Sequence, residues 1–171
     1  GAMAATTDRG RLLTLTVSRV QKELGYGHVA YFAPGETTLA LECEAGSERP
    51  AALSVDLERL TWAVRGGAPL QASRDGFSEI AVPVRAGEQA LGVLNVLRSG
   101  EGGFGEDEAN LLSALSGQLA LALQKTASIE ATERMARQMA TLYDLGLETS
   151  ALRDLKGLFV KSTEEAGRLI K

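Results

Sequence analysis

The stretch from Ser78 to Ile129 decides the fold: it reads SEIAVPVRAGEQALGVLNVLRSGEGGFGEDEANLLSALSGQLALALQKTASI. Residues 80–84 and 91–97 are apolar at nearly every position, which is typical of strands that are covered on both faces. Between them, Arg85-Ala86-Gly87-Glu88 places a glycine where a tight turn needs a positive φ. The sequence therefore predicts two adjacent strands, a glycine-rich loop and a long helix.

The predicted helix begins near Glu106, with Asp107 and Glu108 in its first turn, where negative side chains suit the helix dipole. Apolar and small side chains then recur by three and four, which is typical of a coiled-coil seam. We expect this seam, with Leu13 and Val17 from an earlier helix, to form the interface of a homodimer. Its members are Leu112, Leu115, Leu119, Ala122, Thr126 and Ile129.

Beyond the seam the helix is predicted to continue with an exposed surface, because Glu133 and Arg137 form an i,i+4 pair of opposite charge. The spacing is irregular near Thr132 and resumes at Met135 and Met139. Irregular coiled coils have alternative registers of similar energy, so we predict that residues 132–139 are a switch element. Residues 147–155 break the pattern, and a new helix is expected after them.

The first half of the chain predicts further elements from period and turn signals. A helix with Leu13 and Val17 on its apolar side ends at Gly25. The strand Thr38–Glu44 alternates, with Leu39, Leu41 and Cys43 expected on one face. The other predicted elements are a strand at His28–Ala33, a helix at Val55–Arg65 closed by Gly66-Gly67, and a short strand at Leu70–Ala72.

Together these segments resemble a GAF domain, the small sensory module of bacterial kinases, cyclases and transcription regulators. The second half resembles the family in SEIAVPV, GVLNV and FGEDEANLLSALSGQLALAL, and the first half in KELGYGH, YFAPGETTLALECEAG and LTWAVRGGAPL. The resemblance covers roughly residues 9–130. It implies an α/β (α+β) fold in three layers, with a central, largely antiparallel sheet, the terminal helices on one face and the pocket elements on the other.

This resemblance sets the expected domain organisation. Residues 1–8 are interpreted as a cleavage scar and flexible N-terminus, because the chain begins Gly-Ala-Met. Residues 9–130 form the GAF-like domain and 131–150 a coiled-coil signalling helix. Residues 151–171 are expected to start a following element such as the first helix of a second GAF domain, since their spacing resembles that of residues 12–24. The parent protein is expected to be a sensor kinase, diguanylate cyclase or regulator.

Composition limits the partners and the compartment. The net charge of −4 argues against nucleic acid, which requires clustered Lys and Arg. No apolar run approaches the roughly 20 residues of a membrane span, so we expect no membrane contact. The one cysteine, Cys43, cannot form an internal disulfide, which favours a reducing, cytoplasmic compartment.

The sequence shows no catalytic constellation, and we expect no enzyme, no cofactor and no metal. Cys43 and His28 could be neighbours on adjacent strands, but a small core cysteine and a polar residue at a strand end explain them better. A zinc site needs more His and Cys ligands than the chain has. The family's methionine sulfoxide reductases use several cysteines, heme ligation by His28 is disfavoured, and bilin-binding relatives carry their cysteine elsewhere.

Some relatives bind cyclic nucleotides through an Asn-Lys pair, a later Phe and an Asp-Glu pair. Phe104, Asp107 and Glu108 resemble the second part of that motif, but Arg98-Ser99 stands where the Asn-Lys pair is expected. The departure favours a structural interpretation, in which Phe104 is a hydrophobic plug at the helix start.

The pocket of this family is expected to be small or open here, because the connections Gly46–Ala52 and Ser73–Phe77 are too brief to roof a tetrapyrrole. Asn95, a polar residue within an apolar strand, is the leading pocket candidate; the alternative is an amide that satisfies a neighbouring loop. The full candidate set is Trp62, Arg65, Arg74 and Asn95.

Two functions follow from the sequence. The first is a sensory, regulatory module that homodimerises through its terminal helices and relays a conformational signal to a downstream output domain of the same polypeptide. The alternative is a small-molecule receptor that binds a cyclic nucleotide or metabolite in the pocket.

Overall fold

The computed structural model describes the backbone of residues 2–47, 56–100 and 102–169, and the side chains of residues 8–47, 56–100 and 102–143. The chain divides into two compact units, Gly1–Ala127 and Ser128–Lys171. The elements are α1 (Ala2–Leu24), β1 (His28–Pro34), β2 (Leu39–Gly46), α2 (Leu57–Gly66), β3 (Leu70–Arg74), β4 (Phe77–Ala86), β5 (Gln89–Ser99) and α3 (Glu106–Leu169).

The five strands form one antiparallel sheet in the order β2-β1-β5-β4-β3. The two strands predicted from the apolar runs, β4 and β5, lie at positions three and four of that order, where neighbours on both sides complete their hydrogen bonds. They are joined by a two-residue turn in which Gly87 has a φ of 58°, as the sequence predicted.

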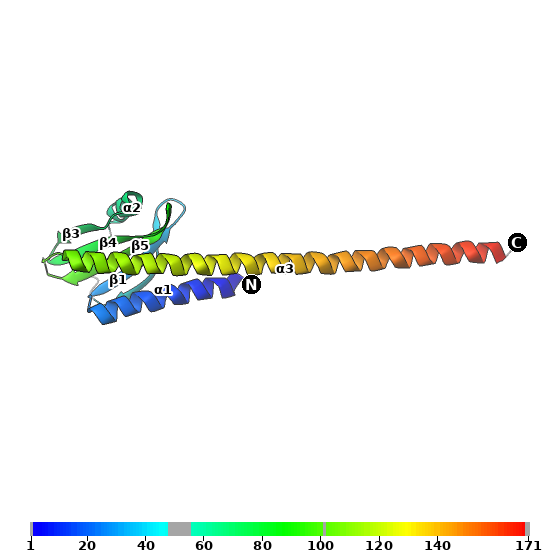
Figure 1. The fold of residues 1–171 in the computed structure, drawn as a ribbon, viewed down its shortest axis with the longest axis horizontal. Coiled ribbons are helices and arrows are strands. Elements are labelled where there is room, and N and C mark those ends of the chain that lie inside the picture. The colour runs from blue at the N-terminus through cyan, green and yellow to red at the C-terminus, as the bar shows by residue number, and fades with distance from the viewer. Residues whose placement is uncertain (1, 48–55, 101, 170–171) are drawn as a thin grey trace. The chain divides into compact units, whose positions relative to one another are not determined.

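The sheet separates two apolar cores, so the first unit has three layers (Figure 1). On one face, α1 and the first turns of α3 pack on the sheet through side chains such as Val17, Leu112 and Leu119. On the other face, α2 packs through Leu60 and Ala63. This arrangement confirms the predicted three-layer α/β fold with terminal helices on one face and a long C-terminal helix.

Short-range polar contacts fix both ends of α2 and the start of α3. Asp56 accepts a hydrogen bond from the Arg59 backbone N–H at 3.0 Å, and Gly67 ends the helix in the left-handed region. At α3, the Glu108 carboxylate accepts from the Gly105 N–H at 3.1 Å, which is the side-chain half of a capping box. The acidic cluster after Phe104 therefore starts the helix, as predicted.

The predicted alternation of β2 is wrong in its second half. Tyr31 pairs with Cys43 and Phe32 pairs with Leu41, so β2 holds one extra residue, Glu42, at this point. Such a bulge reverses the faces that follow. Leu41 therefore lies on the α2 face, while Cys43 packs against the core under the terminal helices.

The helices extend further than the sequence pattern indicated. The backbone of α1 is helical from Ala2, within the segment interpreted as flexible. The backbone of α3 is helical to Leu169, so residues 147–155 do not interrupt it. The side chains of residues 144–171 lie outside the described part, and the domain boundaries drawn from the sequence stay predictions.

Four members of the predicted dimer seam have a different role in the structure. Leu13, Val17, Leu112 and Leu119 are at most 3% exposed because they pack against the sheet of their own chain, which leaves their side chains no surface for a partner. Of the others, Leu115, Ala122 and Thr126 are partly buried, and Ile129 is 51% exposed.

Candidate functional site

The α2 face of the sheet carries an unusual polar floor centred on Asn95. Asn95 lies on β5 between Ala30 of β1 and Ala81 of β4, its register partners on either side. Both neighbours are small and buried, and the Asn95 side chain is itself 1% exposed. Among the described residues its Oδ1 has no hydrogen-bond partner, and a buried acceptor without a partner is uncommon in proteins.

A buried ion pair lies at one side of this floor. Arg59 of α2 pairs with Glu79 of β4, and their side chains are 15% and 7% exposed. The pair uses Nη2 of Arg59, while Nε and Nη1 have no hydrogen-bond partner in the described part of the chain. A buried pair of this kind stabilises a fold weakly, because desolvation offsets most of the Coulombic attraction.

A histidine lies at the other side, on β1. His28 pairs with Leu97 of β5, which also pairs with Glu79, so the three residues form one row across the sheet. Its Nε2 lies 3.1 Å from a carboxylate oxygen of Glu44, and its buried Nδ1 has no partner among the described residues. The ring is 4% exposed, so bulk water does not satisfy that nitrogen.

These three side chains account for most of the unpartnered buried polar atoms that the structure describes; the others are on Ser116 and Glu130 of α3. Arg59 offers donors, Asn95 an acceptor, and a neutral His28 either role depending on its tautomer. Hydrogen-bonding groups of both kinds are therefore left without a partner on this face of the sheet, among the described residues.

The sequence-based candidate set coincides with this site only at Asn95. Trp62 is 65% exposed, because α2 turns Leu60, Ala63 and Val64 toward the sheet instead. Arg65 is exposed one turn of helix after it, and Arg74 is exposed at the end of β3. The structure does not bring these three residues to Asn95.

Sequence reasoning did not predict that Arg59, Glu79 and His28 lie with Asn95 on the α2 face of the sheet. One signal was available: Glu79 is a charged residue inside the apolar strand SEIAVPV, where a strand covered on both faces must bury it. A buried carboxylate requires a cation, which points to a nearby arginine.

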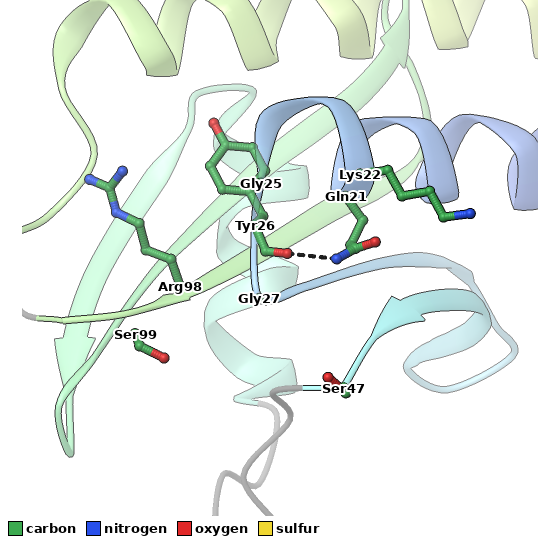
Figure 2. Close-up of a pocket in the computed structure, with 8 residues that line it drawn as sticks. All are labelled: Gln21, Lys22, Gly25, Tyr26, Gly27, Ser47, Arg98 and Ser99. Carbon is green, nitrogen blue, oxygen red and sulfur yellow. Dashed lines mark hydrogen bonds between the residues drawn. The ribbon is translucent and has the colours of Figure 1, made fainter.

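An open cavity of about 670 Å³ lies elsewhere, where α1 ends and β5 ends (Figure 2). Lys22 and Arg98 are the cationic side chains of this cavity. They do not point toward one another, because the Lys22 side chain extends along α1, away from Arg98. Its lining residues in the described chain are Gln21, Lys22, Gly25, Tyr26, Gly27, Ser47, Arg98 and Ser99.

Arg98 is instead engaged at the start of α3. It donates to Glu108 at 2.8 Å and to the Gly103 carbonyl, and its guanidinium lies 4.5 Å from the centre of the Phe104 ring. Tyr26 packs on the same ring, with 5.8 Å between ring centres. Phe104 is 7% exposed and is the hydrophobic plug that the sequence predicted.

The Cys43 and His28 side chains do not meet. Cys43 pairs with Tyr31, three residues along β1 from His28, so the two side chains point to opposite faces. Burial, reinforced by the charge of Glu42, raises the pKa of the Cys43 thiol to about 11. A thiol with that pKa is protonated at neutral pH and is a poor nucleophile.

Neither a metal-binding cluster nor a helix able to span a membrane is present in the described residues. In that part of the chain no three His, Cys, Asp or Glu side chains are placed to hold a metal ion. Nor does any helix there combine the length and apolar character that crossing a bilayer requires.

Comparison with known proteins decides the family. The family model described as GAF domain matches residues 6–124. The chain belongs to the GAF domain family. No curated protein sequence matches it.

Solved structures share the fold of this GAF domain at low identity. The second GAF domain of DevS from Mycobacterium smegmatis is 21% identical, with 72% of this chain and 99% of that chain covered and a TM-score of 0.61. The blue-light-absorbing PixJ GAF domain from Thermosynechococcus elongatus is 17% identical, covering 79% and 96%, with a TM-score of 0.64. A type II free methionine-R-sulfoxide reductase from Thermoplasma acidophilum is 17% identical, covering 71% and 96%, with a TM-score of 0.59.

Proposed function

We propose that this GAF domain is a non-catalytic regulatory module that forms a homodimer through α1 and α3 and relays a conformational signal to a downstream output domain. The observation that carries the proposal is the dual role of α3. Leu112, Leu119 and Leu123 belong to the core on the sheet, and the same helix continues as the second unit to Leu169. A change in the sheet therefore acts directly on an element that leaves the domain. The single cysteine supports a reducing, cytoplasmic setting.

The outer surface of the helical layer supports the dimer. Leu15 of α1 is 63% exposed, and Leu111 and Leu121 of α3 are 45% and 66% exposed. Large apolar side chains that gather on one helical layer are typical of an interaction surface. These residues replace the buried leucines in the dimer interface that we propose for the first unit.

Analytical ultracentrifugation over a concentration series, without ligand, tests the dimer. We expect Leu121→Glu to remain folded and to sediment as a monomer, because the charge would be buried on association. Leu41→Glu is the matched control, since Leu41 is 42% exposed on β2 and lies on the opposite, α2 face of the sheet. If Leu121→Glu dimerises as the wild type does, the interface lies elsewhere.

A second candidate function, a receptor for a small polar molecule, is favoured by the unpartnered atoms of Asn95, Arg59 and His28. A ligand that binds only the native state raises the melting temperature. We expect a shift from at least one member of a panel of cyclic nucleotides and small carboxylates, and its loss in Asn95→Val. If no member of the panel raises the melting temperature while the protein dimerises normally, the receptor function is refuted and the regulatory function is retained.

A further inference from the structure

Helix α2 covers the Asn95 face of the sheet through a small apolar contact. It has 10 residues, and in Figure 1 it lies on the face of the sheet opposite α1 and α3. Both of its ends are capped within the chain, by the Asp56 side chain and by Gly67. The helix is therefore self-contained, and few side chains hold it on the sheet. Its buried residues are Leu60, Ala63 and Val64.

The interface beneath α2 contains most of the buried polar atoms that have no partner in the described chain. They are Asn95 Oδ1 and His28 Nδ1 on the sheet, and nitrogen atoms of Arg59 on the helix itself. The opposite layer contributes one such residue in the described part of the first unit, Ser116. Leaving a buried polar group unpartnered disfavours a folded arrangement by a factor of about 5 or more. The α2 interface is therefore the layer that gains most from contact with water.

Two polar contacts pin α2 to β4. In the first half of the helix, Arg59 pairs with Glu79. At the C-terminal end, Nη1 of Arg85 donates to the Val64 carbonyl at 2.9 Å, while Nη2 donates to the Glu88 carbonyl at 2.9 Å. Separating the buried ion pair restores the hydration of both charges, which offsets most of the lost attraction. Of the two pins, Arg85 is the one whose contact with α2 is a simple hydrogen bond to the backbone.

We propose that α2 is a lid, which lifts from the sheet as an intact helix and opens the Asn95 floor to water and to small polar molecules. The open state keeps the internal hydrogen bonds and both caps of the helix. It also supplies water to Asn95 Oδ1 and His28 Nδ1, which have no access to water when α2 is closed. Such a local opening requires less free energy than complete unfolding.

This inference deepens the receptor candidate, because it states how the polar floor is reached. A ligand that binds the floor only in the open state shifts the population of α2 toward that state. The lid itself does not depend on a ligand, since the unpartnered atoms gain water when α2 lifts in the free protein. The opening is therefore measurable in the absence of any added molecule.

Hydrogen–deuterium exchange of the full chain, followed by mass spectrometry, tests the lid. Peptides from α2 report its opening, and peptides from β5, which has a strand on each side, report complete unfolding. We expect the α2 amides to exchange faster than the β5 amides. In Asn95→Val, opening no longer hydrates an orphaned acceptor, so the α2 amides should exchange about 5-fold or more slowly than in the wild type.

A pair of arginine variants provides the matched comparison. Arg85→Met removes the hydrogen bond to the Val64 carbonyl, so the α2 amides should exchange about 5-fold faster. Arg65→Met is the control, because Arg65 is exposed on the same helix and its loss should leave the exchange of α2 unchanged. Circular dichroism confirms that each variant is folded.

Two results would overturn the lid. If the α2 and β5 amides of the wild type exchange with the same protection, α2 opens only when the whole domain unfolds. If Asn95→Val slows the β5 amides and leaves the α2 amides unchanged, α2 opens without exposing the floor. Failure of the receptor candidate is seen separately, because it is a ligand panel without any rise in melting temperature, whether or not the α2 amides exchange early.

Discussion

Replacing Asn95 by valine should make the protein more stable. Asn95 Oδ1 is buried without a partner among the described residues, and an unsatisfied buried polar group costs about 1–3 kcal/mol. Valine has a similar volume and suits the centre of a strand between Ala30 and Ala81. Taking the lower end for imperfect packing, we expect the free energy of unfolding to rise by about 1 kcal/mol, which raises the melting temperature by about 2–4 °C for a chain of this size.

Urea unfolding followed by circular dichroism measures this directly, with a higher midpoint and an unchanged m-value expected. Asn95→Asp is the matched control, because it keeps the shape but buries a charge and should destabilise the fold. If Asn95→Val lowers the free energy of unfolding by about 1 kcal/mol or more, then Oδ1 is satisfied in solution and our reasoning from an orphaned acceptor is refuted.

Four further outcomes are expected. Gly92→Ala should cost about 3 kcal/mol, because the new Cβ would lie 2.5 Å from the Tyr31 hydroxyl, whereas Gly10→Ala meets nothing within 4 Å; urea midpoints compare them. Glu79→Gln should cost about 3–5 kcal/mol by leaving Arg59 buried without its carboxylate, and the double leucine variant of both residues should recover most of it. Burial raises the pKa of Tyr31 to about 12. The native state therefore holds that proton more tightly, so the contribution of Tyr31 to stability is constant below about pH 10 and falls by about 1.4 kcal/mol per unit as the pH rises from 10 to 12. Denaturant midpoints measured at pH 8 and at pH 11 should differ less in Tyr31→Phe than in the wild type, because the variant lacks the titrating hydroxyl. In the full-length parent, an activity assay with and without stimulus should find output locked when an ideal heptad replaces Thr132, Met135 and Met139; a normal response would make the helix a spacer.

The sheet and the start of α3 could be predicted because their signals are local. Nearly continuous apolar runs mark β4 and β5 as buried on both faces, Gly87 marks their turn, and the acidic residues after Phe104 mark the helix start. The bulge at Glu42 could not be predicted, since a single extra residue leaves the alternation of β2 looking regular while it reverses the faces beyond it.

The dimer seam shows a different limit of sequence reasoning. Two stripes on α3 share the same three-four spacing, one through Leu112 and Leu119 and one through Leu111 and Leu121. Periodicity shows that a helix has an apolar side, but it does not say whether the partner is the chain's own sheet or another molecule. The stripe through Leu112 and Leu119 packs on the sheet. Only the exposed fractions of Leu111 and Leu121 show that the second stripe is not buried within its own chain.

The polar site was missed for a related reason, because its members come from distant parts of the sequence. Arg59 and Glu79 are 20 residues apart, and His28 reaches the same row only through the β1–β5 pairing. Antiparallel topology brings them together, and topology is a property of the whole sheet that no local window contains.

Three separate strands contact the segment that leads into α3. Gln71 of β3 accepts from the Phe104 N–H at 3.1 Å, Ser78 of β4 accepts from the Gly103 N–H at 3.1 Å, and Arg98 of β5 pairs with Glu108. The first turn of α3 and the segment before it are thus tied to three of the five strands by side-chain contacts. A relay from the sheet to α3, as proposed above, would begin at these contacts, because they are where a shift of β3, β4 or β5 reaches the helix first.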